Sequence, residues 1–115
     1  MYSIDNKQFL CSTSVTMYFL GGKWKAAILI HLITKKRYNE LRKELPMVTE
    51  RTLSLQLKEL EADELISRKV YTDKPPLKVE YEMTAFGRTL IPLLEEIDKW
   101  GKNIAQTNSR ITVIK

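Results

Sequence analysis

The most regular pattern of hydrophobic and polar positions lies in residues 49–63, T-E-R-T-L-S-L-Q-L-K-E-L-E-A-D. At about 3.6 residues per turn, Leu53, Leu57 and Leu60 fall on one narrow stripe of a helix. The opposite stripe carries two cations, a leucine and an alanine: Arg51, Leu55, Lys58 and Ala62. The first stripe can anchor the helix to a core, which leaves the second projecting. We therefore expect this helix to be a probe, and its cations favour the major groove of DNA.

The residues before this helix predict a shorter helix and a tight turn. Thr49 is a plausible N-cap of the probe helix, because its hydroxyl can accept an orphan backbone N–H. Pro46 ends the preceding segment, in which Asn39 is the expected N-cap and Leu41 and Leu45 are the apolar anchors. A short helix, a tight turn and a second helix with a polar outer face form a helix-turn-helix arrangement.

Two further helices are predicted nearer the N-terminus, after a mixed, polar arm over residues 1–10. Residues 12–20 form a short apolar run, with hydroxyl residues to cap its start and Gly21-Gly22 to close its end. Residues 23–33 are apolar on most faces, so this helix is expected to be central. His31 lies outside its main stripe, and a solvated or hydrogen-bonded surface histidine is expected there.

Two alternating segments after the probe helix predict a β-hairpin. Residues 65–73 (L-I-S-R-K-V-Y-T-D) and 79–84 (V-E-Y-E-M-T) alternate apolar and polar positions, with Ile66 and Val70 on one side of the first. The connecting K-P-P-L-K is stiffened by two prolines and charged by two lysines. A hairpin with a rigid, cationic tip directly after a probe helix is the wing of a winged helix-turn-helix.

A last, long helix is expected from Ala85 to about Ala105, with Thr84 as its cap. Its apolar stripe consists of Leu90, Leu94, Ile97 and Ile104, with Trp100 beside it. Pro92 is expected to bend this helix, because it removes a backbone hydrogen bond. The stripe is longer than a small core needs, so its C-terminal half is expected to meet a partner chain. The alternative is packing within its own subunit.

Length and composition agree with one domain over residues 1–115, with a core over about residues 11–105, in a mainly α fold with a small β-hairpin. The chain has 115 residues, of which 43% are hydrophobic. The 19 Lys and Arg residues against 14 Asp and Glu give a net charge of +5. This balance moderately favours a polyanionic partner.

The scarcity of Cys and His limits the possible chemistry. One Cys and one His exclude an intrachain disulfide framework and are too few soft ligands for a zinc site. Cys11 and His31 are the one Cys–His combination open to nucleophilic catalysis, and no glycine-rich phosphate loop accompanies them. We therefore expect no enzyme, metal or cofactor. With no signal-peptide pattern and no apolar run of about 18 residues, a cytoplasmic protein without a membrane partner is expected.

Several fragments, in their order and spacing, resemble one known family. They are F-L-G-G-K-W-K, R-Y-N-E-L-R-K-E-L-P, L-K-E-L-E-A-D-E-L-I, P-P-L-K-V-E-Y-E-M-T and F-G-R-T-L-I-P-L-L. Together they resemble the HxlR-type winged helix-turn-helix transcriptional regulators, which are MarR-like in fold. The resemblance covers about residues 11–100.

The resemblance implies a bacterial, homodimeric regulator that binds double-stranded DNA, with N- and C-terminal dimerisation helices. The residues expected at the dimer interface are Val15, Tyr18, Phe19, Leu90, Leu94, Ile97, Trp100 and Ile104. Residues 49–58 correspond to the recognition surface and residues 73–78 to the wing tip. Cys11 matches a cysteine that senses oxidants or electrophiles in a subset of the family. No small-molecule effector is identified.

The chain departs from the family pattern in ways that have physical consequences. Glycine is common in the family at the positions of Met47 and Glu64, and proline at that of Ser12. If the backbone at position 64 needs a positive φ, a glutamate there costs about 1 kcal/mol relative to glycine. The family's usual polar residue at position 55 is replaced by Leu55.

The chemistry of DNA recognition assigns expected roles to these residues. Expected contacts on the probe helix are Thr49, Glu50, Arg51, Thr52, Ser54, Leu55, Gln56 and Lys58. Expected phosphate contacts are Lys35, Lys36, Arg37, Lys74 and Lys78, while Arg42 and Lys43 are either phosphate contacts or solvated charges. Arg51 could pair with a guanine and Leu55 could pack on a thymine methyl. Two copies related by a two-fold axis would require a roughly palindromic operator.

Two alternatives remain open from the sequence. Cys11 is either a reactive thiol or a buried, inert one. The fold could also serve as a protein-interaction module without specific DNA binding. Glu50, Glu59 and Glu61 favour this alternative, whereas the wing and the basic connector over residues 34–37 (T-K-K-R) disfavour it.

Overall fold

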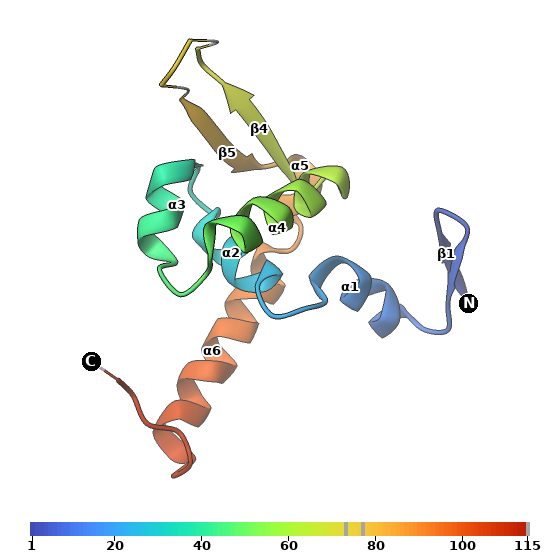
Figure 1. Cartoon of the computed structure of the whole chain (residues 1–115). Helices are drawn as coiled ribbons and strands as arrows, with labels where there is room; N and C mark the ends of the chain where they lie inside the picture. The colour runs from blue at the N-terminus through green and yellow to red at the C-terminus, as the bar shows by residue number, and fades with distance from the viewer. Residues whose placement is uncertain (73, 77, 115) are drawn as a thin grey trace.

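A computed structural model describes residues 1–72, 74–76 and 78–114. The helices are α1 (Ser12–Leu20), α2 (Lys25–His31), α3 (Tyr38–Glu44), α4 (Glu50–Ala62), α5 (Ala85–Arg88) and α6 (Ile91–Thr107). The strands are β1 (Tyr2–Ile4), β2 (Lys7–Phe9), β3 (Lys36–Arg37), β4 (Ile66–Val70) and β5 (Val79–Met83). Three parts project from a central body: the β4–β5 hairpin, the N-terminal hairpin and α6 (Figure 1). Among the described residues, no helix is long and apolar enough to cross a membrane.

The core forms where the apolar stripe of α4 meets α2. Leu53, Leu57 and Leu60 of α4 are at most 1% exposed, as the helical spacing predicts. Burying each leucine side chain stabilises the fold by about 1.5–3 kcal/mol. Ile28 and Leu29 of α2 are fully buried in the same cluster. This packing fixes the rotation of α4 about its axis, and with it the face that α4 presents to solvent.

The turn between α3 and α4 is held by specific polar contacts. The Thr49 hydroxyl accepts the backbone N–H of Thr52 at 3.1 Å, so the predicted N-cap of α4 is confirmed. The Arg42 guanidinium donates to the carbonyl of Val48 at 3.0 Å. The predicted N-cap of α3 is wrong: Arg37 occupies that position instead of Asn39, and its backbone N–H donates to the Glu40 carboxylate at 2.8 Å.

The wing is part of a three-stranded antiparallel sheet with the order β3-β5-β4. The hairpin is confirmed, with Ile66 opposite Met83 and Val70 opposite Val79. The strand β3, in which Lys36 pairs with Tyr81, was expected to be only a connector. Its two residues are too few to carry an alternating pattern. Residues 73 and 77, within the predicted strand end and wing tip, lie outside the described residues.

The prediction of one continuous helix after the wing is wrong. The chain forms α5, breaks at Thr89 and Leu90, and continues as α6. Pro92 lies in the first turn of α6, where its missing N–H costs no intrahelical hydrogen bond, so it starts a helix instead of bending one. Thr84 does cap α5, accepting the backbone N–H of Gly87 at 2.9 Å. A Cβ on Gly87 would overlap the Leu65 carbonyl oxygen.

The N-terminal arm is more ordered than the sequence predicts. Strands β1 and β2 form a hairpin in which Tyr2 pairs with Phe9. Its turn residues Asp5 and Asn6 both have positive φ, 47° and 70°. A turn with positive φ at both central residues is a type I′ turn, which commonly joins two strands of a hairpin. Asp and Asn tolerate a positive φ best among non-glycine residues. The Asp-Asn pair was therefore the signal for this hairpin.

Candidate nucleic-acid interface

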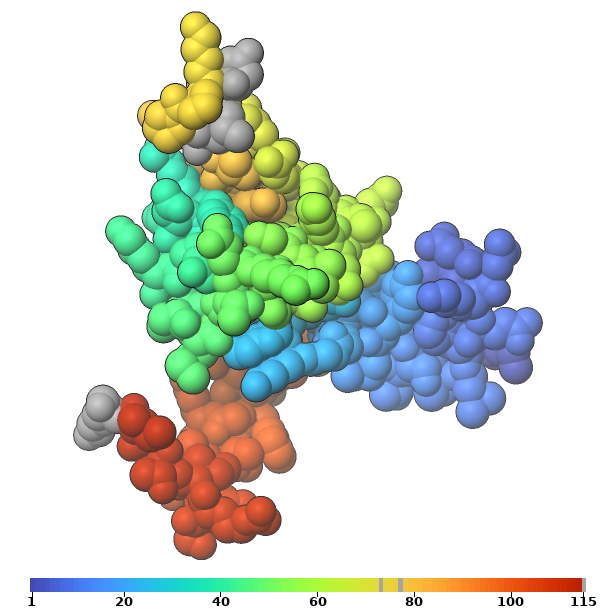
Figure 2. All heavy atoms as spheres, viewed as in Figure 1, coloured from blue at the N-terminus to red at the C-terminus, as the bar shows by residue number. Residues whose placement is uncertain are grey.

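The outer face of α4 is exposed as the two-stripe pattern predicts. Arg51, Leu55 and Lys58 are exposed on it, and Leu55 keeps 53% of its surface accessible. In Figure 2 this helix lies across the same face of the molecule above which the wing projects. A polyanion that lies along this face can therefore meet the helix and the wing together.

The hydroxyl groups at the start of α4 retain hydrogen-bonding capacity. The Thr49 hydroxyl donates to Thr52 Oγ1 at 2.9 Å. The hydroxyl hydrogen of Thr52 remains available to an outside acceptor, because an O–H group carries both a donor and acceptor lone pairs. Ser54 and Gln56 are half-buried on the flanks of the exposed stripe.

The predicted phosphate-binding cations fall into two groups. Lys35 lies 3.8 Å from a carboxylate oxygen of Glu80, and Lys36 lies 2.9 Å from Glu44. Within the described parts of the chain, Arg37, Lys74 and Lys78 form no ion pair. The second group is therefore better placed to bind phosphate, because its charge is not already neutralised.

Glu44 also binds His31, which is the hydrogen-bonded surface histidine that the sequence predicts. The ring Nδ1 of His31 lies 2.6 Å from Glu44 Oε1, and Lys36 lies against the other oxygen. Hydrogen bonds from His31 and Lys36 hold the pKa of the Glu44 carboxyl below its usual value. These contacts tie α2 and β3 to the end of α3.

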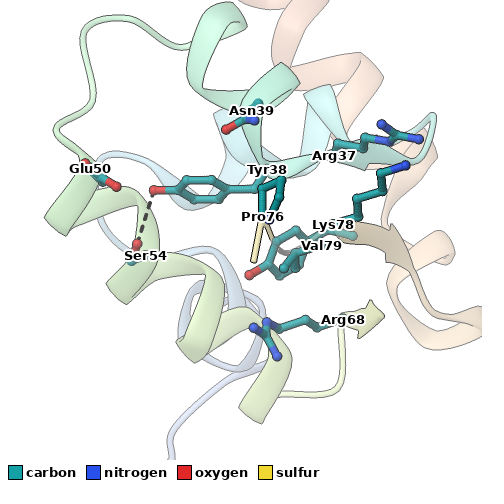
Figure 3. Close-up of a pocket in the computed structure, with 10 residues that line it drawn as sticks. Arg37, Tyr38, Asn39, Glu50, Ser54, Arg68, Pro76, Lys78 and Val79 are labelled. Atoms are coloured by element: carbon teal, nitrogen blue, oxygen red, sulfur yellow. Dashed lines mark hydrogen bonds between the residues drawn. The ribbon is translucent and has the colours of Figure 1, made fainter. Parts of the chain in front are cut away.

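A cleft of about 480 Å³ opens between α3, α4 and the wing. The polar and charged groups that line it include Arg37, Tyr38, Glu50, Ser54, Arg68 and Lys78 (Figure 3). The hydroxyl groups of Tyr38 and Ser54 lie 3.3 Å apart, so they join α3 to α4 across the cleft.

Arg68 was not among the predicted DNA contacts, although the strand pattern contained a signal for it. Alternation places Arg68 on the same side of β4 as Ile66 and opposite Tyr81 of β5, both of which are buried. Arg68 is nevertheless exposed, so this side of the sheet continues beyond the buried core and reaches solvent. The sequence could not show that α4 and the cleft lie at this end of the sheet.

The thiol of Cys11 is exposed just before the start of α1, so the alternative of a cysteine buried within its own subunit is wrong. Its Sγ lies 3.4 Å from the hydroxyl oxygen of Ser14. Hydrogen bonding to Ser14 lowers the pKa of the Cys11 thiol, which favours the reactive thiolate.

The residues expected at a dimer interface do not form one uniform surface. Leu94 is fully buried in the core of its own subunit, so its assignment to the interface is wrong: the first turns of α6 pack on α2. Leu90 also packs against this core. Ile97 and Trp100, further along α6, are 44% and 66% exposed.

The other expected interface residues are partly buried. Val15 and Ile104 each keep part of their surface accessible. Tyr18 and Phe19 belong to a series of edge-to-face aromatic contacts that runs from Phe9 to Phe86, with ring centroids 5.1–5.4 Å apart. This series connects β2, α1 and α5.

The sequence of residues 19–109 matches the model of the HxlR-like helix-turn-helix family. The chain belongs to this family. The HxlR-like chain is 52% identical to an uncharacterized HTH-type transcriptional regulator of Bacillus subtilis, YdeP, over 88% of its own length and 78% of that protein's. It is thus a DNA-binding transcriptional regulator, and the interpretation as a protein-interaction module alone is not supported.

Two solved structures relate this HxlR-like regulator to regulators that were solved in a defined redox state. The redox regulator HypR in its oxidised form is 47% identical, with a TM-score of 0.75 over 81% of this chain and 96% of that one. The reduced form of the transcriptional regulator YodB from B. subtilis is 28% identical, with a TM-score of 0.67 over 90% of this chain and 100% of that one. Both share the winged helix-turn-helix fold of this chain.

Proposed function

We propose that this HxlR-like regulator binds a roughly palindromic operator as a homodimer, with α4 in the major groove and the wing at the adjacent minor groove. The observation that carries the proposal is the face of α4, whose rotation is fixed by three buried leucines while Arg51, Leu55 and Lys58 remain exposed. Because transcription takes place at the chromosome, we expect the protein in the cytoplasm.

Base recognition would come from the exposed face of α4. Arg51 presents a guanidinium that can donate two hydrogen bonds to one guanine, and Leu55 can pack on a thymine methyl. Further contacts would come from Thr49, Thr52, Ser54, Gln56 and Lys58. Since Leu55 is hydrophobic and exposed, it is expected to contribute only when it is covered by a base.

Phosphate contacts would fix the position of the protein on the duplex without conveying sequence. Arg37, Lys74 and Lys78 are the stronger candidates, because among described residues they are not engaged in ion pairs. Lys35 and Lys36 would contribute less, since Glu80 and Glu44 already balance their charge.

Selection of duplexes from a random library, followed by footprinting, tests the proposal. The selected sites should contain two half-sites about one helical turn, roughly 34 Å, apart. Arg51→Ala should relax the preference at one base position in each half-site by about 1–3 kcal/mol. Lys78→Ala, the matched control, should weaken all sequences alike. Selection of unrelated sequences, or an Arg51→Ala variant with unchanged preference, would contradict the proposal.

We further propose that oxidants control DNA binding through Cys11. As the chain's one cysteine, it could form a disulfide with Cys11 of a second copy or with a small thiol. The exposed position of Cys11 and its lowered pKa support this chemistry. Joining two thiols in a disulfide releases two electrons and two protons, and an oxidant such as diamide accepts them and is reduced to its hydrazine.

Diamide treatment, with mass spectrometry and a DNA-binding assay on the same samples, tests the role of Cys11. The wild type should acquire a disulfide and change its affinity for DNA, and a reductant should reverse both changes. Cys11→Ser should bind DNA identically with and without diamide. Modification of Cys11 without any change in DNA affinity would end the sensor proposal.

A further inference from the structure

The cleft between α4 and the wing lies between the two elements that would enter neighbouring grooves of DNA. We propose that it holds one phosphate of the DNA strand that separates those grooves, and that Arg68 is a principal contact. This inference rests on the proposed mode of DNA binding and extends it to a site and a residue outside the predicted contacts.

The location follows from the geometry of the duplex. The major groove is about 12 Å wide and the minor groove about 6 Å, and one sugar–phosphate strand separates them along each boundary. A protein with a helix in one groove and a wing at the next must pass over that strand. In this protein, the surface between the two elements is the cleft of about 480 Å³ (Figure 3).

The charges around the cleft favour an anion. Arg37, Arg68 and Lys78 line it, against the single carboxylate of Glu50 among the lining residues. None of the three cations forms an ion pair with a described residue. This distinguishes them from Lys36, which the protein itself neutralises. An arginine can also donate two hydrogen bonds to one phosphate, which a lysine cannot do in a fixed planar geometry.

A pair of hydroxyl groups supplies a neutral donor in the same cleft. Tyr38 Oη and Ser54 Oγ lie 3.3 Å apart and share one hydrogen bond. Two hydroxyl groups carry two hydrogens, and their mutual bond uses one of them. The second hydrogen remains available to a phosphate oxygen. The cleft therefore combines cations with a hydroxyl donor, which is the usual chemistry of phosphate contacts.

Glu50 restricts where in the cleft the phosphate of a DNA strand can lie. Its carboxylate lines the cleft beside the start of α4 and would repel a phosphate that comes too close. A phosphate is therefore expected on the side of Arg68 and Lys78. Glu50→Gln should remove this repulsion and tighten binding to all duplexes.

The salt dependence of DNA binding tests the role of Arg68. Each phosphate neutralised contributes about −0.9 to the slope of log K against log of salt concentration. Arg68→Gln should reduce the slope by about one phosphate equivalent for each subunit, on operator and generic duplex alike. Arg68→Lys should restore most of the slope. Arg110→Gln removes the same charge from the exposed C-terminal segment and should leave the slope unchanged.

Neutral methylphosphonate linkages, placed one at a time in the operator, locate the contact. At one position per half-site, the substitution should weaken the wild type but cost little further in Arg68→Gln, because the two changes remove the same interaction. Additive losses at every position would overturn the inference. So would equal slopes for Arg68→Gln, Arg110→Gln and the wild type, and in that case the proposed DNA-binding mode would still stand.

Two outcomes separate this inference from its alternatives. If the wild type selects no operator, the proposed function fails. The salt dependence of binding to generic duplex, compared between the wild type and Arg68→Gln, then still decides whether Arg68 contacts a phosphate. If millimolar inorganic phosphate shifts the amide resonances of Tyr38 and Ser54 but Arg68→Gln leaves the DNA slope unchanged, the cleft binds free oxyanions and not the DNA backbone, which overturns the inference.

Discussion

Leu55 and Leu57 are chemically identical and two positions apart on α4, yet they occupy opposite environments. Leu57 is 1% exposed and lies in the core, whereas Leu55 is 53% exposed on the outer face. The contribution of a leucine to stability comes from the apolar surface that folding removes from water. Leu57 therefore holds the fold, and Leu55 is free for recognition.

We predict that Leu57→Ala lowers the free energy of unfolding by about 2–5 kcal/mol, whereas Leu55→Ala changes it by less than about 0.5 kcal/mol. Urea unfolding of both variants measures this difference. Leu55→Ala should instead lose affinity at one thymine of the operator. Replacing that thymine by uracil, which lacks the methyl group, should weaken the wild type but not the variant. An equal effect of uracil on both proteins would exclude contact with the methyl group.

The Glu44 carboxylate predicts a pH dependence of stability. Hydrogen bonds from His31 and Lys36 lower its pKa in the folded protein below the usual 4.5. The unfolded chain therefore takes up a proton first as the pH falls, so the contribution of Glu44 is complete well above pH 4.5 and is lost as the pH falls through the folded value. Glu44→Gln should be less stable than the wild type at pH 7, and the two melting temperatures should converge as the pH falls through the lowered pKa of Glu44. Glu95→Gln, at an exposed position that forms no ion pair with a described residue, serves as the control for the loss of one negative charge.

Single residues on α4 could be assigned from the sequence because helical spacing alone decides which side faces the core. The environment of Lys36 could not be assigned in this way. Its neutralising partner, Glu44, lies on another element, and only the pairing of β3 with β5 and the packing of α3 bring the two together. Spacing along one helix is local information, whereas ion pairs between elements depend on the whole fold.

At the scale of elements, the end of α4 shows how one residue is strained to make a sharp turn. Glu64 has φ = +62°, so the backbone at this position does adopt the left-handed conformation that glycine favours. The backbone N–H of Leu65 donates to the carbonyl of Leu60 at 3.0 Å, and both side chains are buried. This is the hydrogen bond of a Schellman motif, which usually has glycine at the position of Glu64.

We predict that Glu64→Gly stabilises the protein by about 1 kcal/mol, since glycine adopts a positive φ without the steric cost of a Cβ. Thermal or urea unfolding measures the change. Glu61→Gly, within α4, should destabilise by about 1 kcal/mol, because it loosens a regular helix. If both substitutions destabilise equally, the left-handed strain at position 64 is not a significant cost.

Elements with strong local signals were predictable, and those that depend on partners were not. The bounds of α1 follow from its apolar run and the glycines after it, and the cap of α4 follows from Thr49. The predicted hydroxyl cap of α1 is wrong, because Cys11 occupies its N-cap position without a side-chain hydrogen bond. The break between α5 and α6 was missed because the apolar spacing continues through Leu90, although Pro92 marks the start of the new helix. The strand β3 exists only because β5 pairs with it.

At the scale of the whole molecule, the chain is more extended than a compact domain. Its radius of gyration is 16.0 Å, against about 13 Å for a compact chain of this length. The far half of α6 and the N-terminal hairpin both project from the body (Figure 1). Three hydrophobic side chains on α6 are exposed: Leu93 at 39%, Ile97 at 44% and Trp100 at 66%. With a rotation of about 100° per residue, these three side chains lie on one face, which supports the proposed homodimer.

We predict that Trp100→Glu converts a dimer into a monomer without unfolding the core, because Trp100 lies beyond the part of α6 that packs on α2. Gln106→Glu introduces the same charge at an exposed position about 120° away around the helix and should leave the dimer intact. Sedimentation equilibrium measures the assembly, and the unfolding transition checks the core. Since the proposed operator has two half-sites that a dimer binds together, Trp100→Glu should also lose most of its affinity for the full operator while binding a half-site as the wild type does. A Trp100→Glu variant that remains dimeric, with full operator affinity, would place the interface elsewhere and would leave the exposed stripe of α6 for another partner.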